Sequence, residues 1–470
     1  MALLIKQQPL YDTLPIGQQI IFTVSDPTIV ATKYKVKYVA QVHVSNFPIN
    51  PSNNNALIGT FKTTPNNAGV GIFDLRPILE TFVKPDNEPQ STIIPNSDSE
   101  YKGVKAQETM FPIHLVDKFA ISKNSMQRFA VNFFIEYSDT ATGAVINFED
   151  LDPTSSDSYK MFNGVIQYDD VLDVFQNDYG FNINKYYLDG ATRHLLTTAP
   201  DTQYARLEDY GTLPFLHIAS QSVYPLYGFS INYKDSVGGS LGGEVVQWFA
   251  ANGGATGQGV LSNTRLNYFG AFPANLKNWS STFATAVTNG LSYYTVQAVG
   301  SGVGEIWSKL YTIHIQCPNL KGYEGVRLTW LNKWGTWDYY TFNMKSTRSV
   351  TTNRTSYTQL GGTWNERAFK IAGYKGGKKN FRVNSTEKIK LNTDFVTEAE
   401  GVWFEQLINS PEVYVLEGFQ TDASFSSLNN YVEPATVTTS SYIRKTIAND
   451  RLMQYTFDIE KSKMKRTQAV

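Results

Sequence analysis

Residues 326–342 read VRLTWLNKWGTWDYYTF, and this stretch contains the clearest structural signal in the chain. β-branched and aromatic residues alternate with other residues on both sides of the segment 332–335, whose Asn and Gly are typical of a turn. The pattern predicts a β-hairpin with strands at 326–330 and 337–342.

The aromatic residues of this hairpin are distributed over both faces of its second strand. Alternation places Trp337 and Tyr339 on one face and Tyr340 and Phe342 on the other. We therefore expect burial on both faces, with Trp334, Trp337 and Tyr339 fixing the hairpin. Three interpretations stay open: a core strand, a ring-lined face that docks a neighbouring subunit, and a platform on which sugar rings stack.

A second local signal lies further along the chain. Thr397 followed by Glu400 forms a capping box, which predicts a helix at about 397–409. Trp403 and Leu407 lie on its apolar stripe, and we expect them to dock the helix on a sheet.

Most other segments have strand patterns. Alternating apolar residues in 34–44 predict a sheet with one buried face, and a short helix is expected at about 74–83, with Asp74 as its N-cap. Glycine-rich loops are expected at 238–243 and 253–259. Further strands are predicted at 20–24, 129–137, 143–148, 227–233, 293–298, 310–315, 412–416 and 454–460.

These elements predict a mainly β fold of two to three β-sandwich-like domains with a few short helices. We expect an N-terminal β-sandwich domain at 1–155, a central β-rich domain at 156–320 and a C-terminal β domain at 321–470. The basic tail from Lys461 onward is expected to be exposed.

Composition limits the possible classes of protein. The 470 residues carry 41 Lys and Arg against 42 Asp and Glu, which excludes a generally basic nucleic-acid binder, and no nucleic-acid partner is expected. The hydrophobic content of 41% excludes disorder throughout. The single cysteine, Cys317, excludes an internal disulfide. We find no export signal and no apolar stretch long enough to span a membrane.

Chemical motifs are scarce. The glycines of 300–304 precede no helix, and no nucleophile elbow occurs. Acidic pairs at 149–152 and 169–170 are interpreted as solvated loop residues or helix caps. Calcium coordination by 149–152 stays open, although the cluster lacks the glycine and the distal glutamate of a calcium-binding loop. The five histidines, none at metal-ligand spacing from another, are His43, His114, His194, His217 and His314. We therefore predict no catalytic, cofactor-binding or metal-binding residue and no enzymatic activity.

The hairpin residues 331–342, together with 71–80 and 403–415, resemble segments of a group of virion proteins from tailed phages and prophages of Bacteroidetes bacteria. They occur in the same order along the chain. The resemblance implies a structural tail, tail-ring, adaptor or baseplate component, located in the virion after synthesis in the host cytoplasm. Its implied partners are copies of itself and neighbouring virion proteins.

Two other functions stay open. The tyrosines, tryptophans and glycine loops of the middle region, about 160–310, favour a tail adhesin that binds a receptor or a host-surface glycan. A depolymerase is a third hypothesis, and it requires two carboxylates facing each other across a cleft.

Overall fold

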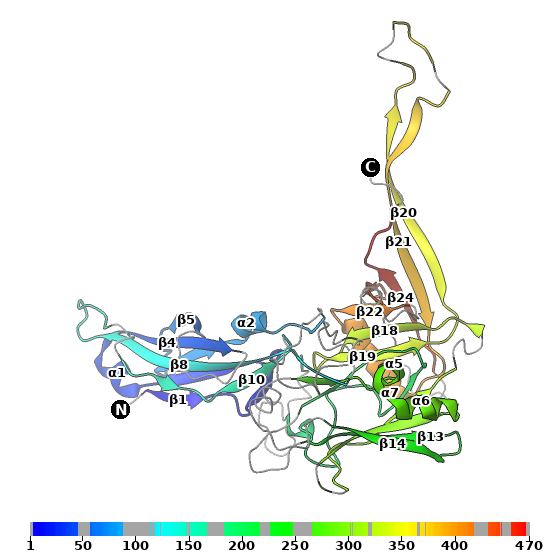
Figure 1. Ribbon diagram of the computed structural model, residues 1–470. Coiled ribbons are helices and arrows are strands. Elements are labelled where there is room, and N and C mark those ends of the chain that lie inside the picture. Colours follow the sequence, from blue (N-terminus) through cyan, green and yellow to red (C-terminus); the bar gives the residue numbers. More distant parts are fainter. Residues whose placement is uncertain are drawn as a thin grey trace. The chain divides into compact units, whose positions relative to one another are not determined.

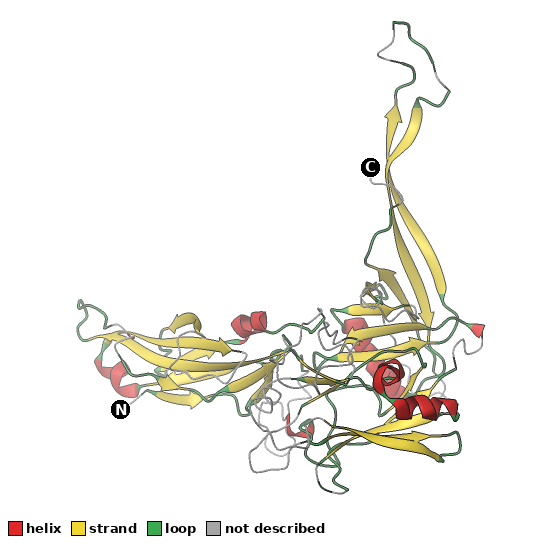
Figure 2. Ribbon diagram, in the orientation of Figure 1, coloured by secondary structure: helices red, strands yellow, loops and turns green. Residues whose placement is uncertain are grey.

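The structure is a computed structural model (Figure 1). It describes residues 3–45, 57–87, 113, 118–122, 124–146, 148, 151–166, 183–216, 226–247, 266–300, 302, 304–317, 322–363, 367–371, 373–417, 431–441, 443 and 453–466. Of these described residues, 46% lie in strands and 13% in helices, so the predicted mainly β class with few short helices is confirmed (Figure 2).

The chain divides into two compact units. Unit 1 comprises residues Met1–Ile315 and Leu331–Asp338, and unit 2 comprises Gln316–Trp330 and Tyr339–Val470. The predicted domain limits near 155 and 320 stay a prediction.

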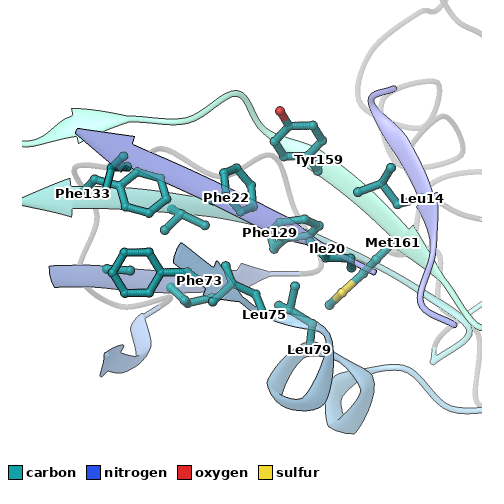
Figure 3. Close-up of a cluster of buried hydrophobic side chains, with 14 of the residues drawn as sticks. Leu14, Ile20, Phe22, Phe73, Leu75, Leu79, Phe129, Phe133, Tyr159 and Met161 are labelled. Atoms are coloured by element: carbon teal, nitrogen blue, oxygen red, sulfur yellow. The ribbon is translucent and has the colours of Figure 1, made fainter. Parts of the chain in front are cut away.

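The first part of unit 1 is a pair of sheets that share an aromatic core. A six-stranded sheet has the order β2-β10-β8-β4-β5, with β9 paired to β8, and a three-stranded sheet has the order β1-β3-β6. Side chains from both sheets meet between them, and the ring centroid of Phe133 lies 5.5 Å from that of Phe22 and 5.7 Å from that of Phe73 (Figure 3). The strands are β1 (Leu4–Gln7), β2 (Thr13–Pro15), β3 (Ile21–Ser25), β4 (Tyr34–Ser45), β5 (Leu57–Thr63), β6 (Val70–Asp74), β8 (Met126–Ser138), β9 (Thr154–Ser155) and β10 (Tyr159–Phe162).

The second face of β4 is covered as well, which corrects the prediction of one buried face. Val39 packs with Phe134 and Phe148 there, and His43 is fully buried. The chain after β8 folds back, with the Ile146 amide donating to the Tyr137 carbonyl, and so brings Phe148 onto this face. The strand predicted at 143–148 is wrong, because within its described residues only this isolated bridge forms.

Short helices follow the first strands of unit 1. The predicted helix near 74–83 is present as α2 (Arg76–Leu79) and a 3-10 turn (Glu80–Phe82), but its N-cap is Leu75. Asp74 still accepts the Arg76 amide at 3.1 Å. Helix α1 (Pro27–Thr32) was not predicted from the sequence, although the Asp26 carboxylate caps its first turn.

The rest of unit 1 is a second pair of sheets. A five-stranded sheet has the order β11-β17-β16-β13-β14 and a three-stranded sheet the order β12-β15-β7. Phe229 of β13 stacks on Phe269 of β15, with centroids 4.7 Å apart, so rings fill the space between these sheets. The strands are β7 (Phe119–Ile121), β11 (Thr202–Ala205), β12 (Leu213–Phe215), β13 (Gly228–Lys234), β14 (Ser240–Gln247), β15 (Asn267–Phe269), β16 (Tyr293–Val299) and β17 (Tyr311–Ile315).

One expectation for this region needs correction. A loop was predicted at 238–243, but β14 begins at Ser240. Gly242 and Gly243 therefore lie in this strand and pair with β13. The loop predicted at 253–259 lies outside the described residues. Two short helices, α5 (Pro273–Trp279) and α6 (Ser281–Thr288), were not predicted from the sequence, and the Ser280 hydroxyl caps α6.

Unit 2 is built on a seven-stranded sheet in the order β19-β18-β22-β23-β24-β21-β20. The predicted helix forms as α7 (Glu398–Asn409), and its capping box is confirmed, because Thr397 and Glu400 exchange side-chain and backbone hydrogen bonds. The strands are β18 (Val326–Leu331), β19 (Trp337–Phe342), β20 (Thr347–Gln359), β21 (Gly377–Asn392), β22 (Val413–Leu416), β23 (Val432–Val437) and β24 (Thr456–Lys461).

The predicted hairpin is strands β18 and β19, whose tip, Leu331–Asp338, belongs to unit 1. The tip closes as the Asn332 amide donates to the Thr336 carbonyl at 2.8 Å. Gly335 has φ 72° in this turn, and a Cβ there would lie 1.4 Å from the Asn163 carbonyl oxygen. Only glycine fits the position.

Candidate functional site

The five residues predicted as interface or architecture candidates are all buried. Trp334 and Trp337 lie in unit 1, where Trp334 meets the Tyr186 ring at 5.2 Å and the Trp337 indole donates to the Asp86 carbonyl at 3.2 Å. Tyr339 lies in unit 2, beneath the Arg327 guanidinium at 5.2 Å.

Trp403 and Leu407 pack in unit 2. The Trp403 ring lies 4.8 Å from that of Trp330 and 5.4 Å from that of Phe404, and Leu407 is fully buried. Because the chain itself covers the five candidates, they act as core residues, and no sugar or subunit can reach their faces.

Within the described part of the chain, the residues considered for chemistry do not form a site. Burial lowers the pKa of His43, His194 and His314, in each case as the largest cause, so all three favour the neutral ring. His114, His217, 169–170 and most of 149–152 lie outside the described residues. Among the residues that are described, no three His, Cys, Asp or Glu side chains are grouped to hold a metal ion, and no helix is long and apolar enough to cross a membrane.

The most exposed feature of unit 2 is a β-ribbon that sequence reasoning missed. Strands β20 and β21 pair from Thr347↔Lys390 to Gln359↔Gly377, whereas β21 pairs with β24 only over 388–392. The ribbon therefore continues beyond the other strands of its sheet as two strands alone (Figure 1). We call residues 350–384 the arm. Its first strand, β20, is exposed along almost its whole length and is the edge strand of the sheet.

Large apolar side chains project from the arm into solvent. Ile371 is 81% exposed, Tyr374 76% and Leu360 68%. Five others in the arm are also exposed: Val350, Tyr357, Phe369, Phe381 and Val383. Several exposed large apolar residues on an edge ribbon are typical of a surface that another protein covers.

A charged network holds the base of the ribbon. Lys461 of β24 lies 2.6 Å from Glu417 and 3.0 Å from Glu433, while Lys465 donates to Glu387 of β21 at 2.6 Å. Arg348 of β20 completes the network, 3.1 Å from Glu387 and 3.0 Å from Glu417. The expectation that the tail is exposed is thus wrong for Lys461, whose side chain is 5% exposed because it faces these carboxylates.

The ion pairs of this network stabilise the charged forms of Glu387 and Lys461. The hydrogen bond from Lys465 is the largest influence on Glu387 and, with Arg348 and Lys461, it holds the pKa of that carboxyl below its ordinary 4.5. Burial by itself lowers the pKa of Lys461, but the hydrogen bonds to Glu417 and Glu433 outweigh it, so this pKa lies above 10.5. The base of the ribbon is therefore fixed by ion pairs at neutral pH.

A second surface feature lies on the five-stranded sheet of unit 1. Tyr204, His314 and Tyr293 occupy neighbouring positions on β11, β17 and β16. Their ring centroids are 5.3 Å and 5.1 Å apart in that order. Tyr204 is 48% exposed and belongs to the edge strand, so it ends the row.

Comparison with known proteins gives no family. No family model matches the sequence, and no curated protein matches it significantly. Among solved structures, native E. coli alpha-2-macroglobulin, a cryo-EM reconstruction, is similar at a TM-score of 0.18 and 7% identity. The match covers 83% of this chain and 21% of the macroglobulin chain, and at such a TM-score it carries no argument.

Proposed function

We propose that the protein is a structural subunit of a bacteriophage virion, a tail, tail-ring, adaptor or baseplate component that assembles by protein–protein contacts. The resemblance of residues 71–80, 331–342 and 403–415 to tailed-phage virion proteins supports the virion assignment. The exposed arm is the observation that supports assembly most strongly. The proposed role of the protein is non-enzymatic, and its proposed location is the virion.

The arm favours assembly for a physical reason. A two-stranded ribbon is marginally stable alone, and its exposed apolar side chains gain free energy when a partner removes them from water. The edge strand β20 also presents backbone hydrogen-bonding groups that a partner strand can pair with. When a neighbouring subunit covers the arm, the apolar side chains leave water and the backbone groups of the edge strand find hydrogen-bonding partners.

Replacing Leu360, Ile371 and Tyr374 together by serine tests the role of the arm. We expect self-association of the full chain, measured by sedimentation velocity, to weaken by at least about 100-fold, because central apolar contacts dominate interface energies. The melting temperature should stay within about 2 °C of the parent, since the three side chains are exposed.

The matched control replaces three exposed apolar residues of unit 1, Val237, Ile306 and Leu310, by serine. This control should associate like the parent chain. Normal association of the arm variant would overturn the role of the arm, and absence of the protein from purified particles by mass spectrometry would overturn the virion assignment.

The row Tyr204–His314–Tyr293 favours a second candidate function, a receptor- or glycan-binding adhesin. An exposed tyrosine face at the end of a row of rings is a surface on which a sugar ring can stack. If the full chain binds polysaccharide purified from the host surface, Tyr204→Ala should weaken that binding at least about 10-fold, while Tyr323→Ala, an exposed tyrosine in unit 2, should leave it unchanged. Equal binding by both variants, or no binding by the parent, would remove this candidate.

A further inference from the structure

We infer that the free edge of strand β20 pairs antiparallel with the same edge of a second copy of this chain, about a two-fold axis through Asn353. The inference rests on the proposed function, because it names the partner of the arm and the way in which the two copies contact each other.

Strand β20 is an unprotected sheet edge. It ends the seven-stranded sheet, and twelve of its thirteen residues are exposed, so no strand of the described residues pairs with its outer side. Natural proteins usually protect such an edge with lysine, proline or a bulge. β20 contains no Lys and no Pro, and the bulge of the ribbon lies in β21, where Phe381 is the extra residue between Asn380 and Arg382. The outer edge of β20 is therefore regular and open to pairing.

The sequence of β20 is complementary to itself about Asn353. Full antiparallel overlap of two copies sets Arg354 opposite Thr352. It also sets Arg348, which pairs with carboxylates of its own copy, opposite Thr358. Each arginine thus faces a neutral residue, and no like charges lie directly opposite one another. Five threonines give the strand a high β propensity, and the contact has the two-fold symmetry that is commonest among soluble oligomers.

The cations of the arm decide the direction of pairing. Residues 367–382 carry six Lys and Arg and no Asp or Glu, and Glu366 is the one acidic residue of 350–384. Parallel pairing would bring two such basic segments side by side, where they repel each other. Antiparallel pairing over the thirteen residues of β20 separates the tip ends of the two strands by about 40 Å, well beyond the screening length of about 8–10 Å.

A second copy also compensates for the weakness of an isolated ribbon. Two strands alone are marginally stable, whereas three or more with a buried face are stable. The contact joins β21 and β20 of one copy to β20 and β21 of the other, so both arms enter one four-stranded antiparallel sheet. A strand of a different protein would stabilise only one arm. The tip of each arm then lies beside the base of the neighbouring ribbon, where a larger sheet is present to cover Leu360 and Ile371.

Charges placed on the edge test the pairing in the full chain. Thr351 of one copy lies opposite Thr355 of the other, and both are exposed. Replacing both by Glu, or both by Lys, puts two pairs of like charges across the contact, whereas Thr351→Lys with Thr355→Glu makes both pairs attractive. Within one copy the two positions are about 13 Å apart and do not contact each other.

Sedimentation velocity should show the mixed variant associating at least about 10-fold more tightly than the Glu/Glu variant and than the Lys/Lys variant. A dependence on net charge alone gives a different order, with the mixed variant between the other two. The three variants therefore separate pairing about Asn353 from general attraction of the basic arm to an acidic surface.

Cross-linking provides a second readout. Asn353→Cys, in a chain whose exposed Cys317 is replaced by serine, should form disulfide-linked dimers under mild oxidation. Opposite residues of an antiparallel pair have Cα atoms about 4.5–5.5 Å apart, within reach of a disulfide. The matched control is Asn380→Cys, which is exposed on β21 and away from the free edge, and it should stay monomeric on a non-reducing gel.

The inference is overturned if the mixed variant falls between the other two, or if cysteines at 353 and 380 cross-link equally. If the parent chain associates in either case, the proposed function survives and only the mode of pairing is wrong. A parent chain that never associates contradicts both.

Discussion

The Trp403→Ala variant should lose about 3–5 kcal/mol of unfolding free energy in unit 2. The indole of Trp403 is 4% exposed and contacts Trp330, Tyr340 and Phe404, with centroids 4.8, 6.0 and 5.4 Å away. Truncation removes this buried apolar surface and leaves a cavity between α7 and the sheet. Thermal unfolding followed by near-ultraviolet circular dichroism measures the loss.

The neighbouring residue gives the control for this variant. Val402 lies on the same helix but is 43% exposed, so Val402→Ala should change stability by less than about 1 kcal/mol. A Trp403→Ala melting temperature equal to that of the parent would show that the ring does not dock the helix.

The second large effect is expected at the charged network. Lys461→Met should destabilise unit 2 by about 3 kcal/mol at neutral pH, because it leaves Glu417 and Glu433 close together without their shared cation. Lys463→Met removes an exposed lysine from the same tail and should have little effect. Chemical denaturation of both variants measures the difference.

The pH dependence distinguishes loss of charge pairing from simple loss of packing. The pKa of Glu387 lies below 4.5, so its contribution to stability is complete above that pH and is lost as the pH falls through the folded pKa. The pKa of Lys461 lies above 10.5 in the parent, so the stability that this cation contributes is complete below that pH and is lost as the pH rises through the folded pKa. The stability gap between Lys461→Met and the parent should therefore be constant around neutral pH and narrow above about pH 10.5. A gap that stays constant above this pH would contradict an electrostatic origin.

Local signals in the sequence predicted the local structure well. The hairpin of β18 and β19 and the helix α7 formed as expected, because turn residues and a capping box act within a few positions of the chain. Alternation also predicted β4 and β8. The short helices α1, α5 and α6 were missed because 6–8 residues display too little of a helical period.

The candidate site could not be predicted, because it depends on contacts between distant residues. The run TRSVTTNRTSYTQ in β20 contains five threonines, which indicates an exposed strand, but nothing local shows that its partner strand extends past the sheet. Lys461 lies in a basic tail and is buried only because Glu417 and Glu433 come from neighbouring strands. The aromatic residues predicted as candidates stand out in the sequence, but they are buried and belong to the cores of the two units.

We propose that this chain assembles with copies of itself through the arm at 350–384. Sedimentation velocity of the full-length chain over a range of concentrations, at low salt, tests it most directly. We predict species larger than a monomer that grow with concentration and disappear when Leu360, Ile371 and Tyr374 are replaced by serine. A parent chain that sediments as a monomer at every concentration would contradict assembly through the arm.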